Sequence, residues 1–292
     1  MNIIGKRNLW FFISGCLIAV SLLALLSNFY FRGKMLNFGI DFTGGTIISL
    51  RFEKLPSGDQ LRKELAKYEL KQNIIQTTGS QDVSIRTEPL TNEMRAQILA
   101  DMEKNFGKME VLEVDMVGPL IGKELRSQAF WALLIASFLI VIYVTYRFEF
   151  TYAIAALLAL VHDAIITTGF VALFWIDVDT SFVAAILTIL GYSINDTIII
   201  FDRIRENLHR ANLSKLSFIE LANLSVLQTM ARSINTVLTT EMMLVSLLIF
   251  GGATIKSFAL VLLFGFTMGA YSSIFVAAPL VSLWENRGKK KK

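Results

Sequence analysis

The sequence predicts a polytopic α-helical membrane protein with six transmembrane helices and a small α+β domain of ferredoxin-like type between the first two. Hydrophobic residues make up 54% of the chain and the mean hydropathy is +0.55, which is too apolar for a soluble protein of 292 residues. Six apolar stretches are long enough to cross a bilayer. Residues 32–127 instead follow the pattern β-α-β-β-α-β, which is typical of a ferredoxin-like domain.

The six predicted spans each offer roughly the 20 apolar residues that the hydrocarbon layer requires. They cover residues 9–31, 128–146, 152–174, 181–201, 231–250 and 257–283. The first stretch is longer than the core of a cleavable signal peptide and lacks an Ala-x-Ala ending, so we expect it to remain as an uncleaved anchor.

The basic residues predict the orientation of these spans. Basic residues fall on alternate loops, at Lys6 and Arg7, Arg147, Arg203 to Arg210, and Lys289 to Lys292, whereas residues 175–180 carry two acids and no base. The positive-inside rule then places both termini in the cytoplasm. The expected organisation is a cytoplasmic N-terminus with the first helix (1–31), a periplasmic domain (32–127), a five-helix region (128–283) and a basic tail (284–292), with an archaeal cell exterior as the alternative to the periplasm.

Composition also excludes several kinds of partner. The net charge is only +4 and the basic residues cluster where topology needs them, so nucleic-acid binding is not expected. The single cysteine, Cys16, allows no intrachain disulfide and no thiolate metal site. The two histidines, His162 and His209, do not form a convincing metal site. We therefore expect no metal and no cofactor.

The periplasmic domain can be divided into its elements. Ser57 and Gln60 form a capping box that predicts a helix through Lys71. The remaining expected elements are strands over Phe38–Phe52, Asn73–Thr78, Asp82–Glu88 and Met109–Val117, a turn at Gly79–Gln81 and a helix over Asn92–Asn105. Thr43, Gly44 and Gly45 are expected to form a turn or bulge beside a strand.

An aspartate, Asp196, lies inside the apolar fourth span. An ionised aspartate at the centre of a membrane helix is unfavourable by about 2.5 to 3.5 kcal/mol, so a proton or ion pathway is favoured over lipid contact. Thr188, Tyr192 and Asn195 share one broad helix face with Asp196, and this face must point into a bundle or an aqueous cavity. The alternative is a permanently protonated Asp196 that is hydrogen-bonded to a neighbouring helix.

The fifth span opens with Arg232 and continues with a polar stripe through Asn235, Thr236, Thr239 and Thr240. This stripe could face the fourth span and pair Arg232 with Asp196, although Arg232 could also snorkel to the cytoplasmic surface. Glu241 follows Arg232 by nine residues and therefore lies on the opposite helix face, without an assigned partner.

Two further features lie in the third and sixth spans. His162 and Asp163 fall near the middle of the third span, where a proton relay and a satisfied interhelical network are both open interpretations. Gly265, Gly269 and Ser273 recur every four residues in the sixth span, which predicts close helix packing.

Three segments together resemble the SecF branch of the SecD/SecF family of bacterial protein-export membrane proteins. They are Phe38-Gly39-Ile40-Asp41-Phe42-Thr43-Gly44-Gly45, Val117-Gly118-Pro119, and the stretch from Gly191-Tyr192-Ser193-Ile194-Asn195-Asp196 to Asn207. The resemblance extends over nearly the whole chain. It identifies Gly39, Asp41, Gly44, Gly45, Gly118, Pro119 and Gly191 as family motif positions. The chain also resembles one half of the proton-driven RND transporter superfamily.

The resemblance implies a non-enzymatic subunit that forms a complex with SecD, docks on the SecYEG channel and uses proton flow, not ATP, to pull a translocating preprotein outward. It implies that Asp196 is the family's intramembrane aspartate, Arg232 its basic partner, and His162 with Asp163 a family pair. Together with Asn195 and Thr236 these form the predicted proton-coupling set. Glu241 departs from the apolar residue usual at its position.

Two alternatives follow from the same residues. Asp163 and Asp196 could form the carboxyl pair of an intramembrane aspartyl protease, but the sequence before Asp196 lacks the Gly-x-Gly-Asp arrangement. The chain could also be a structural subunit that conducts no protons. In the proton-driven case, the linkers Phe31–Leu36 and Gly118–Lys123, which contain glycine, are predicted hinges.

Overall fold

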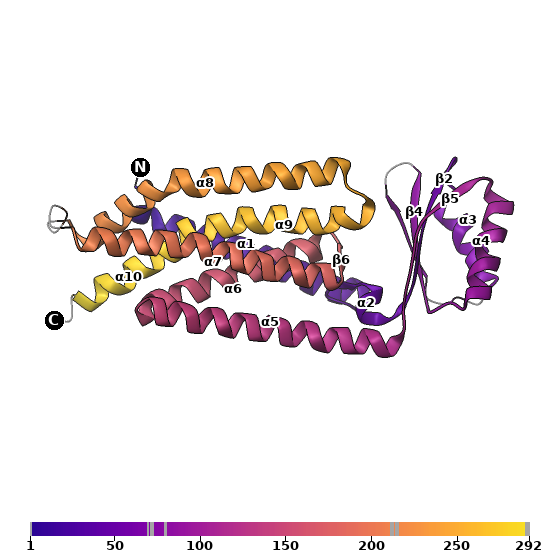
Figure 1. Cartoon of the computed structure of the whole chain (residues 1–292), viewed down its shortest axis with the longest axis horizontal. Coiled ribbons are helices and arrows are strands. Elements are labelled where there is room, and N and C mark those ends of the chain that lie inside the picture. Colours follow the sequence, from indigo (N-terminus) through magenta and orange to yellow (C-terminus); the bar gives the residue numbers. More distant parts are fainter. Residues whose placement is uncertain are drawn as a thin grey trace. The chain divides into compact units, whose positions relative to one another are not determined.

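The computed structural model describes residues 2–68, 70, 73–78, 81–210, 213 and 216–289. The chain divides into two compact units, one made of Met1–Asn37 with Ala132–Lys292 and the other of Phe38–Trp131. Figure 1 shows the long helices of the first unit and the sheet with its two helices in the second. Each unit is described by itself below.

Six helices in the described part of the chain are long and apolar enough to span a membrane, which confirms the predicted number. The spans are Ile4–Arg32, Pro119–Arg147, Phe150–Leu173, Thr180–Leu208, Phe218–Phe250 and Ile255–Trp284. The corresponding elements are η1 (Ile4–Lys6) with α1 (Arg7–Arg32), α5 (Pro119–Arg147), α6 (Phe150–Leu173), α7 (Thr180–Leu208), α8 (Phe218–Phe250), α9 (Ala253–Ser272), a π-helical turn (Ser273–Ala277) and α10 (Ala278–Lys289).

Capping residues make some of these helices longer than their apolar stretches. Helix α8 begins at Phe218, well before the predicted span, because Ser217 and Glu220 form a reciprocal capping box. The backbone nitrogen of Glu220 donates to Ser217 Oγ at 3.3 Å, and that of Ser217 donates to Glu220 Oε2 at 2.9 Å. Helix α7 begins after Asp179, whose Oδ1 accepts from the Phe182 backbone nitrogen at 2.8 Å.

Helices α6, α7 and α9 form the buried centre of the membrane unit. Helix α9 contacts α6, α7 and α8, while α1 packs along α6. A Cβ atom added at Gly265 would lie 2.1 Å from Ile189 Cδ1, and one at Gly269 would lie 3.0 Å from Ser193 Cβ. The small residues therefore allow α9 to approach α7 closely, which confirms the predicted packing role of these glycines. Helices α5 and α8 are the least buried spans.

The second unit contains a four-stranded antiparallel sheet in the order β3-β4-β2-β5. Its elements run β2 (Gly45–Phe52), α3 (Gly58–Ala66), β3 (Ile74–Thr78), β4 (Asp82–Thr87), α4 (Asn92–Phe106) and β5 (Met109–Val117). The first strand lies between the third and the fourth, and this order confirms the ferredoxin-like prediction.

Alternating residues of the sheet build the core of this unit. Ile48 lies opposite Ile85 on β4 and opposite Val114 on β5. The buried cluster packs sheet residues against both helices and contains Ile48, Leu50, Phe52, Leu61, Leu65, Leu70, Val83, Ile85, Leu90, Ile98 and Met102. One face of the sheet is thus covered by α3 and α4.

The strand predicted over Phe38–Phe52 is not continuous, and this part of the prediction was wrong. The structure has β1 (Asn37–Phe38), a helical turn α2 (Ile40–Thr43) and then β2. Gly44 and Gly45 have φ values of +74° and +139°, which break the extended run where only glycine is unstrained. Helix α3 also ends earlier than predicted, at Ala66. Its predicted end at Lys71, and Gly79 and Ser80 of the predicted turn, lie outside the described residues.

Candidate proton-coupling site

Asp196 lies in the middle of α7 with its carboxyl group turned toward α8. The residue is only 7% exposed. Ser233 of α8 donates a hydrogen bond from Oγ to Asp196 Oδ1 at 2.6 Å. The second oxygen, Oδ2, is buried without a hydrogen-bond partner among the described residues. A buried carboxyl with one free oxygen is well placed to bind and release a proton.

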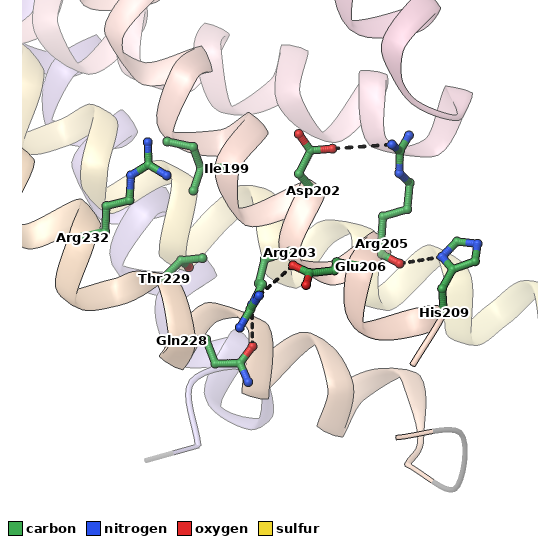
Figure 2. A pocket seen from close by; sticks show the side chains of 9 residues that line it. All are labelled: Ile199, Asp202, Arg203, Arg205, Glu206, His209, Gln228, Thr229 and Arg232. Carbon is green, nitrogen blue, oxygen red and sulfur yellow. Dashed lines mark hydrogen bonds and ion pairs between the residues drawn. The ribbon is translucent and has the colours of Figure 1, made fainter. Parts of the chain in front are cut away.

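Arg232 does not form the ion pair with Asp196 that the sequence suggested as one possibility. It precedes Ser233 on α8, so its side chain leaves the helix about 100° away from the serine that contacts Asp196. Arg232 is exposed and has no acidic partner within 4.0 Å in the described part of the chain. In Figure 2 its guanidinium lies beside Ile199, at the edge of a pocket.

The pocket lies between the ends of α7 and α8 and has a volume of about 1020 Å³. Arg203 links its two walls, because it donates to Glu206 Oε2 on α7 at 2.6 Å and to Gln228 Oε1 on α8 at 2.7 Å (Figure 2). The remaining lining residues are Ile199, Asp202, Arg205, His209, Thr229 and Arg232. The end of α7 is also tied to α5, since Arg147 Nη2 donates to Asp202 Oδ1 at 2.9 Å.

Asn195 and Thr236, the other predicted residues of this region, are exposed on α7 and α8. Thr236 donates its hydroxyl proton to the backbone oxygen of Arg232 at 2.8 Å. The structure therefore groups Arg232 and Thr236 on an open polar side of α8, and neither of them touches Asp196. This polar side continues through Asn235 and Thr239, which are exposed as well.

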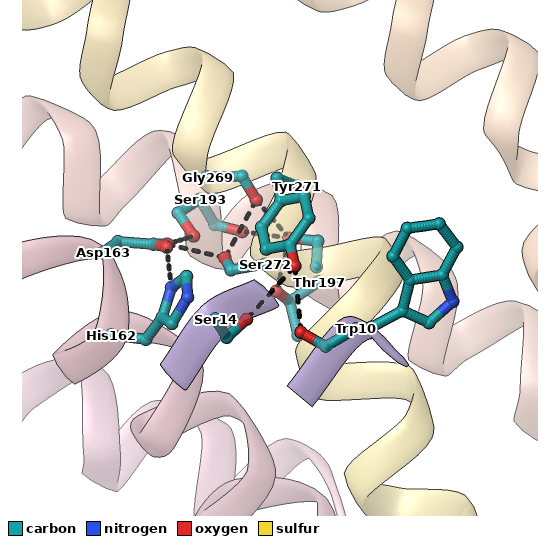
Figure 3. A network of polar contacts seen from close by, with 10 residues as sticks. Trp10, Ser14, His162, Asp163, Ser193, Thr197, Gly269, Tyr271 and Ser272 are labelled. Atoms are coloured by element: carbon teal, nitrogen blue, oxygen red, sulfur yellow. Dashed lines mark hydrogen bonds and ion pairs between the residues drawn. The ribbon is translucent and has the colours of Figure 1, made fainter. Parts of the chain in front are cut away.

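His162 and Asp163 form a second polar centre, inside the bundle. Asp163 is completely buried, at 0% exposure. Its Oδ1 lies 3.0 Å from His162 Nδ1, while its Oδ2 accepts from Ser193 Oγ at 2.6 Å and from Ser272 Oγ at 2.7 Å (Figure 3). Asp163 thus joins α6, α7 and α9, and its oxygens are well satisfied, unlike those of Asp196.

The polar network around Asp163 extends to α1. The His162 ring stacks on Tyr271 with ring centroids 6.0 Å apart, and His162 Nε2 is buried with no partner in the described chain. The Tyr271 hydroxyl donates to the backbone oxygen of Trp10 at 3.1 Å and lies 3.2 Å from Ser14 Oγ (Figure 3). Helix α9 changes to π geometry directly after Ser272, a distortion that is frequent at functional sites.

The serines that complete both centres were not predicted from the sequence. Ser193 and Ser272 bind Asp163, Ser233 binds Asp196, and Ser273 lies 2.7 Å from the Thr197 hydroxyl. Serine is common in packed membrane helices, so the residue type alone did not distinguish them. The available signal was spacing, because Ser193 precedes Asp196 by three residues and shares its side of α7.

Glu241 has a partner on α9. Thr267 donates a hydrogen bond from Oγ1 to Glu241 Oε1 at 2.6 Å. The carboxyl is therefore held between α8 and α9, on a different side of α8 from Arg232, as its spacing predicted.

Most of the predicted family motif positions come together at the start of α5. A Cβ atom on Gly44 would lie 3.0 Å from Pro119 Cα, and one on Gly45 would lie 2.6 Å from the Thr87 backbone oxygen. Gly39 precedes α2 as its N-cap, and Arg126 of α5 donates to the backbone oxygen of Phe42 in α2 at 2.5 Å. Asp41 is part of this same turn.

Two other motif glycines have free space around them. Gly118 and Gly191 have no atoms within 4 Å of an added Cβ. Gly191 lies on the exposed side of α7, away from the packed α9 interface. Within the described residues, no group of three His, Cys, Asp or Glu side chains is placed to hold a metal ion.

Comparison with known families gives two matches that together reach from the second unit to the last helix. Residues 97–287 match the model of "Protein export membrane protein SecD/SecF, C-terminal". Residues 36–54, which contain Gly44 and Gly45, match the "SecD/SecF GG Motif".

Similar proteins of known name and structure support the same family. The chain is 43% identical to the protein translocase subunit SecF of Sebaldella termitidis, over 97% of this chain and 91% of that protein. It is 41% identical to SecF of Calditerrivibrio nitroreducens, over 99% and 96%. The crystal structure of SecDF from Thermus thermophilus, a translocon-associated membrane protein, matches 98% of this chain with a TM-score of 0.87 and 36% identity.

A second solved structure, SecDF in a super-membrane-facing form, matches the whole chain with a TM-score of 0.70 and 36% identity. This chain spans 39% of each SecDF chain. With its six membrane helices and its matches over nearly the full length of curated SecF subunits, the chain belongs to the SecD/SecF family of multi-pass protein-export membrane proteins, among the SecF subunits of the protein translocase.

Proposed function

We propose that this subunit acts with SecD in the bacterial inner membrane and uses the proton motive force to complete the translocation of preproteins through the SecYEG channel. The single observation that carries this proposal is the state of Asp196. It is a carboxyl buried at the middle of a membrane helix, with one hydrogen bond from Ser233 and one free oxygen among the described residues. Such a group changes charge when it binds a proton, and a charge at this depth is costly in a bilayer.

The open polar side of α8 supports a role for SecD. Arg232, Asn235, Thr236 and Thr239 are exposed on a helix that spans the membrane, and hydrocarbon does not satisfy such groups. A second set of polar helices would cover them. The chain corresponds to 39% of each solved SecDF chain, which leaves room for such a set in the rest of that molecule. We therefore assign the facing surface to SecD and place both termini in the cytoplasm.

Protonation of Asp196 would change the contact between α7 and α8. An ionised Asp196 accepts the hydrogen bond from Ser233, and Arg232 occupies the adjacent position of the same helix. A neutral Asp196 no longer attracts a positive charge, so protonation releases any guanidinium that has approached the carboxylate. One proton that crosses 100 mV releases about 2.3 kcal/mol, which is enough to bias two conformations that differ by a few kcal/mol.

The test is export of a secreted reporter in cells that carry Asp196→Asn at wild-type abundance, with and without a collapsed proton gradient. We expect the variant to lose the gradient-dependent component and to keep any basal component. Asn preserves the acceptor for Ser233, so loss of export would reflect the missing proton site and not a missing hydrogen bond.

The second candidate is a structural subunit that stabilises SecD or the channel without proton conduction. The observation that favours this candidate is the absence of an Arg232–Asp196 ion pair among the described residues. Wild-type gradient-dependent export by Asp196→Asn would support it and would overturn the proton-coupling proposal.

A further inference from the structure

Among the buried polar atoms of α7 that have no hydrogen-bond partner in the described residues, two belong to residues one helical turn apart. They are the hydroxyl oxygen of Tyr192 and Oδ2 of Asp196, for which the described residues supply no partner of good geometry. The hydroxyl of Thr240 on α8 lies near that of Tyr192 but not in hydrogen-bonding geometry, and it donates to the Thr236 backbone oxygen at 2.9 Å. Residues four apart on a helix share one face. Buried polar groups are nearly always hydrogen-bonded, so two adjacent exceptions indicate a place where hydrogen bonds form and break during function.

Glu241 lies on the other side of Tyr192 from Asp196. The hydrogen bonds from Ser233 to Asp196 and from Arg203 to Gln228 fix the antiparallel alignment of α7 and α8. Asp196 and Ser233 lie at the same height along the helix pair. Toward the end where α7 begins and α8 finishes, Tyr192 is about 6 Å from Asp196 along α7, and Glu241 is about 12 Å from Ser233 along α8. Tyr192 therefore lies at an intermediate level.

The side chains of Tyr192 and Glu241 contact neighbouring residues of α9. The Tyr192 ring stacks on Phe266 with centroids 4.2 Å apart, and the next residue, Thr267, holds Glu241 by its hydroxyl at 2.6 Å. Helical side chains lean toward the N-terminus of their own helix, so in this antiparallel pair Tyr192 leans toward Glu241 and Glu241 leans toward Tyr192.

From this arrangement we infer that Glu241 is a second proton-binding carboxyl of the chain and that it exchanges protons with Asp196 through the hydroxyl of Tyr192. The inference rests on the proposed proton use by Asp196 and names the group that supplies it from the side at which α7 begins. It assigns a role to a residue outside the set predicted from the sequence.

The transfer balances without a further reactant. In the described structure the Tyr192 hydroxyl is bonded to neither carboxyl, so the relay forms when this side chain turns to bridge them. Neutral Glu241 then gives its proton to the oxygen of Tyr192 while the original hydroxyl proton of Tyr192 passes to Oδ2 of Asp196. The products are a Glu241 carboxylate, an unchanged tyrosine and a neutral Asp196. Thr267 can donate to Glu241 before and after the transfer, because a carboxyl oxygen accepts in both states.

The charged and titratable groups around Glu241 are few in the described structure. Helix α7 presents Tyr192, with Asp196 one turn beyond it. Helix α9 presents Thr267, and its one charged residue, Lys256, is eleven positions away along the helix. On α8 itself, Arg232 lies on the opposite face. Tyr192 is thus the titratable group between the two carboxyls.

The experiment follows protonation of Asp196 by infrared spectroscopy in the complex with SecD, reconstituted in vesicles, after an acid jump on one side of the membrane. The carbonyl band of protonated Asp196 is assigned by its loss in Asp196→Asn. When the acid jump is made on the side of the membrane where α7 begins, we expect Glu241→Gln and Tyr192→Phe each to slow the appearance of this band at least about tenfold. After a jump on the opposite side the rate stays at the wild-type value.

Both substitutions preserve packing, which keeps the test clear. Glu241→Gln retains a side-chain oxygen that accepts from Thr267, so this variant loses only the proton site. Tyr192→Phe keeps the ring stacked on Phe266. Tyr143→Phe, at a tyrosine on α5 that is 53% exposed, is the matched control and leaves the rate unchanged. Glu241→Asp restores part of the rate.

Protonation of Asp196 at the wild-type rate in both Glu241→Gln and Tyr192→Phe would overturn the inference. Equal slowing from both sides of the membrane would also overturn it, because that result indicates a general structural effect. The proposed function fails independently, if Asp196→Asn exports normally. In that case the infrared rates still report whether Glu241 supplies protons to Asp196.

Discussion

Ser233 of α8 donates a 2.6 Å hydrogen bond to Asp196 of α7, and it is the one hydrogen-bond donor to this carboxyl in the described structure. The bond links the two helices near the middle of each, one position away from Arg232. The Ser233 hydroxyl is the group of α8 that contacts the buried carboxyl, whereas the Arg232 guanidinium forms no ion pair with it in the described structure.

Removal of this hydroxyl should impair gradient-dependent export. Ser233→Ala leaves both oxygens of Asp196 without a donor, which costs about 1 to 3 kcal/mol for a buried group. We expect lower stability of the complex with SecD in thermal unfolding, together with reduced export of a reporter. Ser233→Thr keeps the hydroxyl and should restore both. Ser246→Ala, at a serine of α8 that bonds only its own helix at Met242, is the matched control. Normal export by Ser233→Ala would show that the bond is not needed for coupling.

Substitution by asparagine should lower stability more at Asp163 than at Asp196. Asp163 accepts from Ser193 and Ser272 and lies against His162, so Asp163→Asn places an amide group where acceptors are needed and should destabilise the chain by about 1 to 3 kcal/mol. Asp196→Asn keeps an acceptor for Ser233 and should cost less than about 1 kcal/mol. Thermal unfolding of each variant in complex with SecD makes the comparison. Equal losses would contradict a structural role specific to Asp163.

The sequence predicts the helices of this chain better than their contacts. Apolar length is sufficient for the six spans, and the strand order follows from alternating residues and turns. The start of α8 was missed because hydropathy alone defined the predicted span, although Ser217 and Glu220 carried a capping signal. A turn or bulge was expected at Thr43–Gly45, but the strand was predicted to continue through it because apolar residues alternate on both sides of the two glycines. Their positive φ values depend on packing against Pro119 and Thr87.

The contacts of Asp196 were harder to predict for a geometric reason. Arg232 and Ser233 are neighbours in sequence, and one position changes the direction of a helical side chain by about 100°. Which of them faces Asp196 depends on the rotation of α8 against α7, and that rotation is fixed by distant contacts such as Asn207 with Ser225 at 2.9 Å. Residue type suggested the arginine as the partner of Asp196, whereas helix packing places the serine there.

Close packing of α7 on α9 should make Gly265 intolerant of a side chain. Gly265→Ala introduces a Cβ atom 2.1 Å from Ile189 Cδ1, and overpacking of this kind costs about 1 to 3 kcal/mol. Gly191→Ala on the same helix pair has open space and should keep or slightly raise stability, because alanine favours a helix. Unfolding temperatures of the two variants test this contrast. If Gly191→Ala folds normally but loses export, its open surface contacts a partner.

The glycine pair at the start of β2 should show a similar contrast with Gly118. Gly45→Ala combines a φ of +139° with a Cβ atom 2.6 Å from the Thr87 backbone oxygen, so we expect a loss of about 1 to 3 kcal/mol or more and low abundance. Gly118→Ala meets no atom within 4 Å and should accumulate normally. Immunoblots of membranes and limited proteolysis compare them. Normal abundance of Gly45→Ala would mean that β4 shifts easily, in conflict with its pairing at Thr46 and Thr87.

The stability of the α+β unit should fall at high pH through Tyr68. The Tyr68 hydroxyl donates to Asp101 Oδ2 at 2.5 Å, and this hydrogen bond raises the pKa of Tyr68 to about 12 from its ordinary value of 10.0. Because the folded pKa is above the unfolded one, the bond stabilises the fold fully below pH 10.0 and this contribution disappears as the pH rises through about 12.

Tyr68→Phe removes the bond at every pH. We therefore expect the variant to be less stable than the wild type at neutral pH, and the difference between them to shrink above pH 10.0. Hydrogen exchange of α3 and α4 in the complex with SecD, measured across this range, reports the stability of the unit. Tyr146→Phe, at an exposed tyrosine of α5, is the control and should follow the wild type. A difference that stays constant up to pH 12 would show that Tyr68 stabilises the unit by ring packing and not by its bond to Asp101.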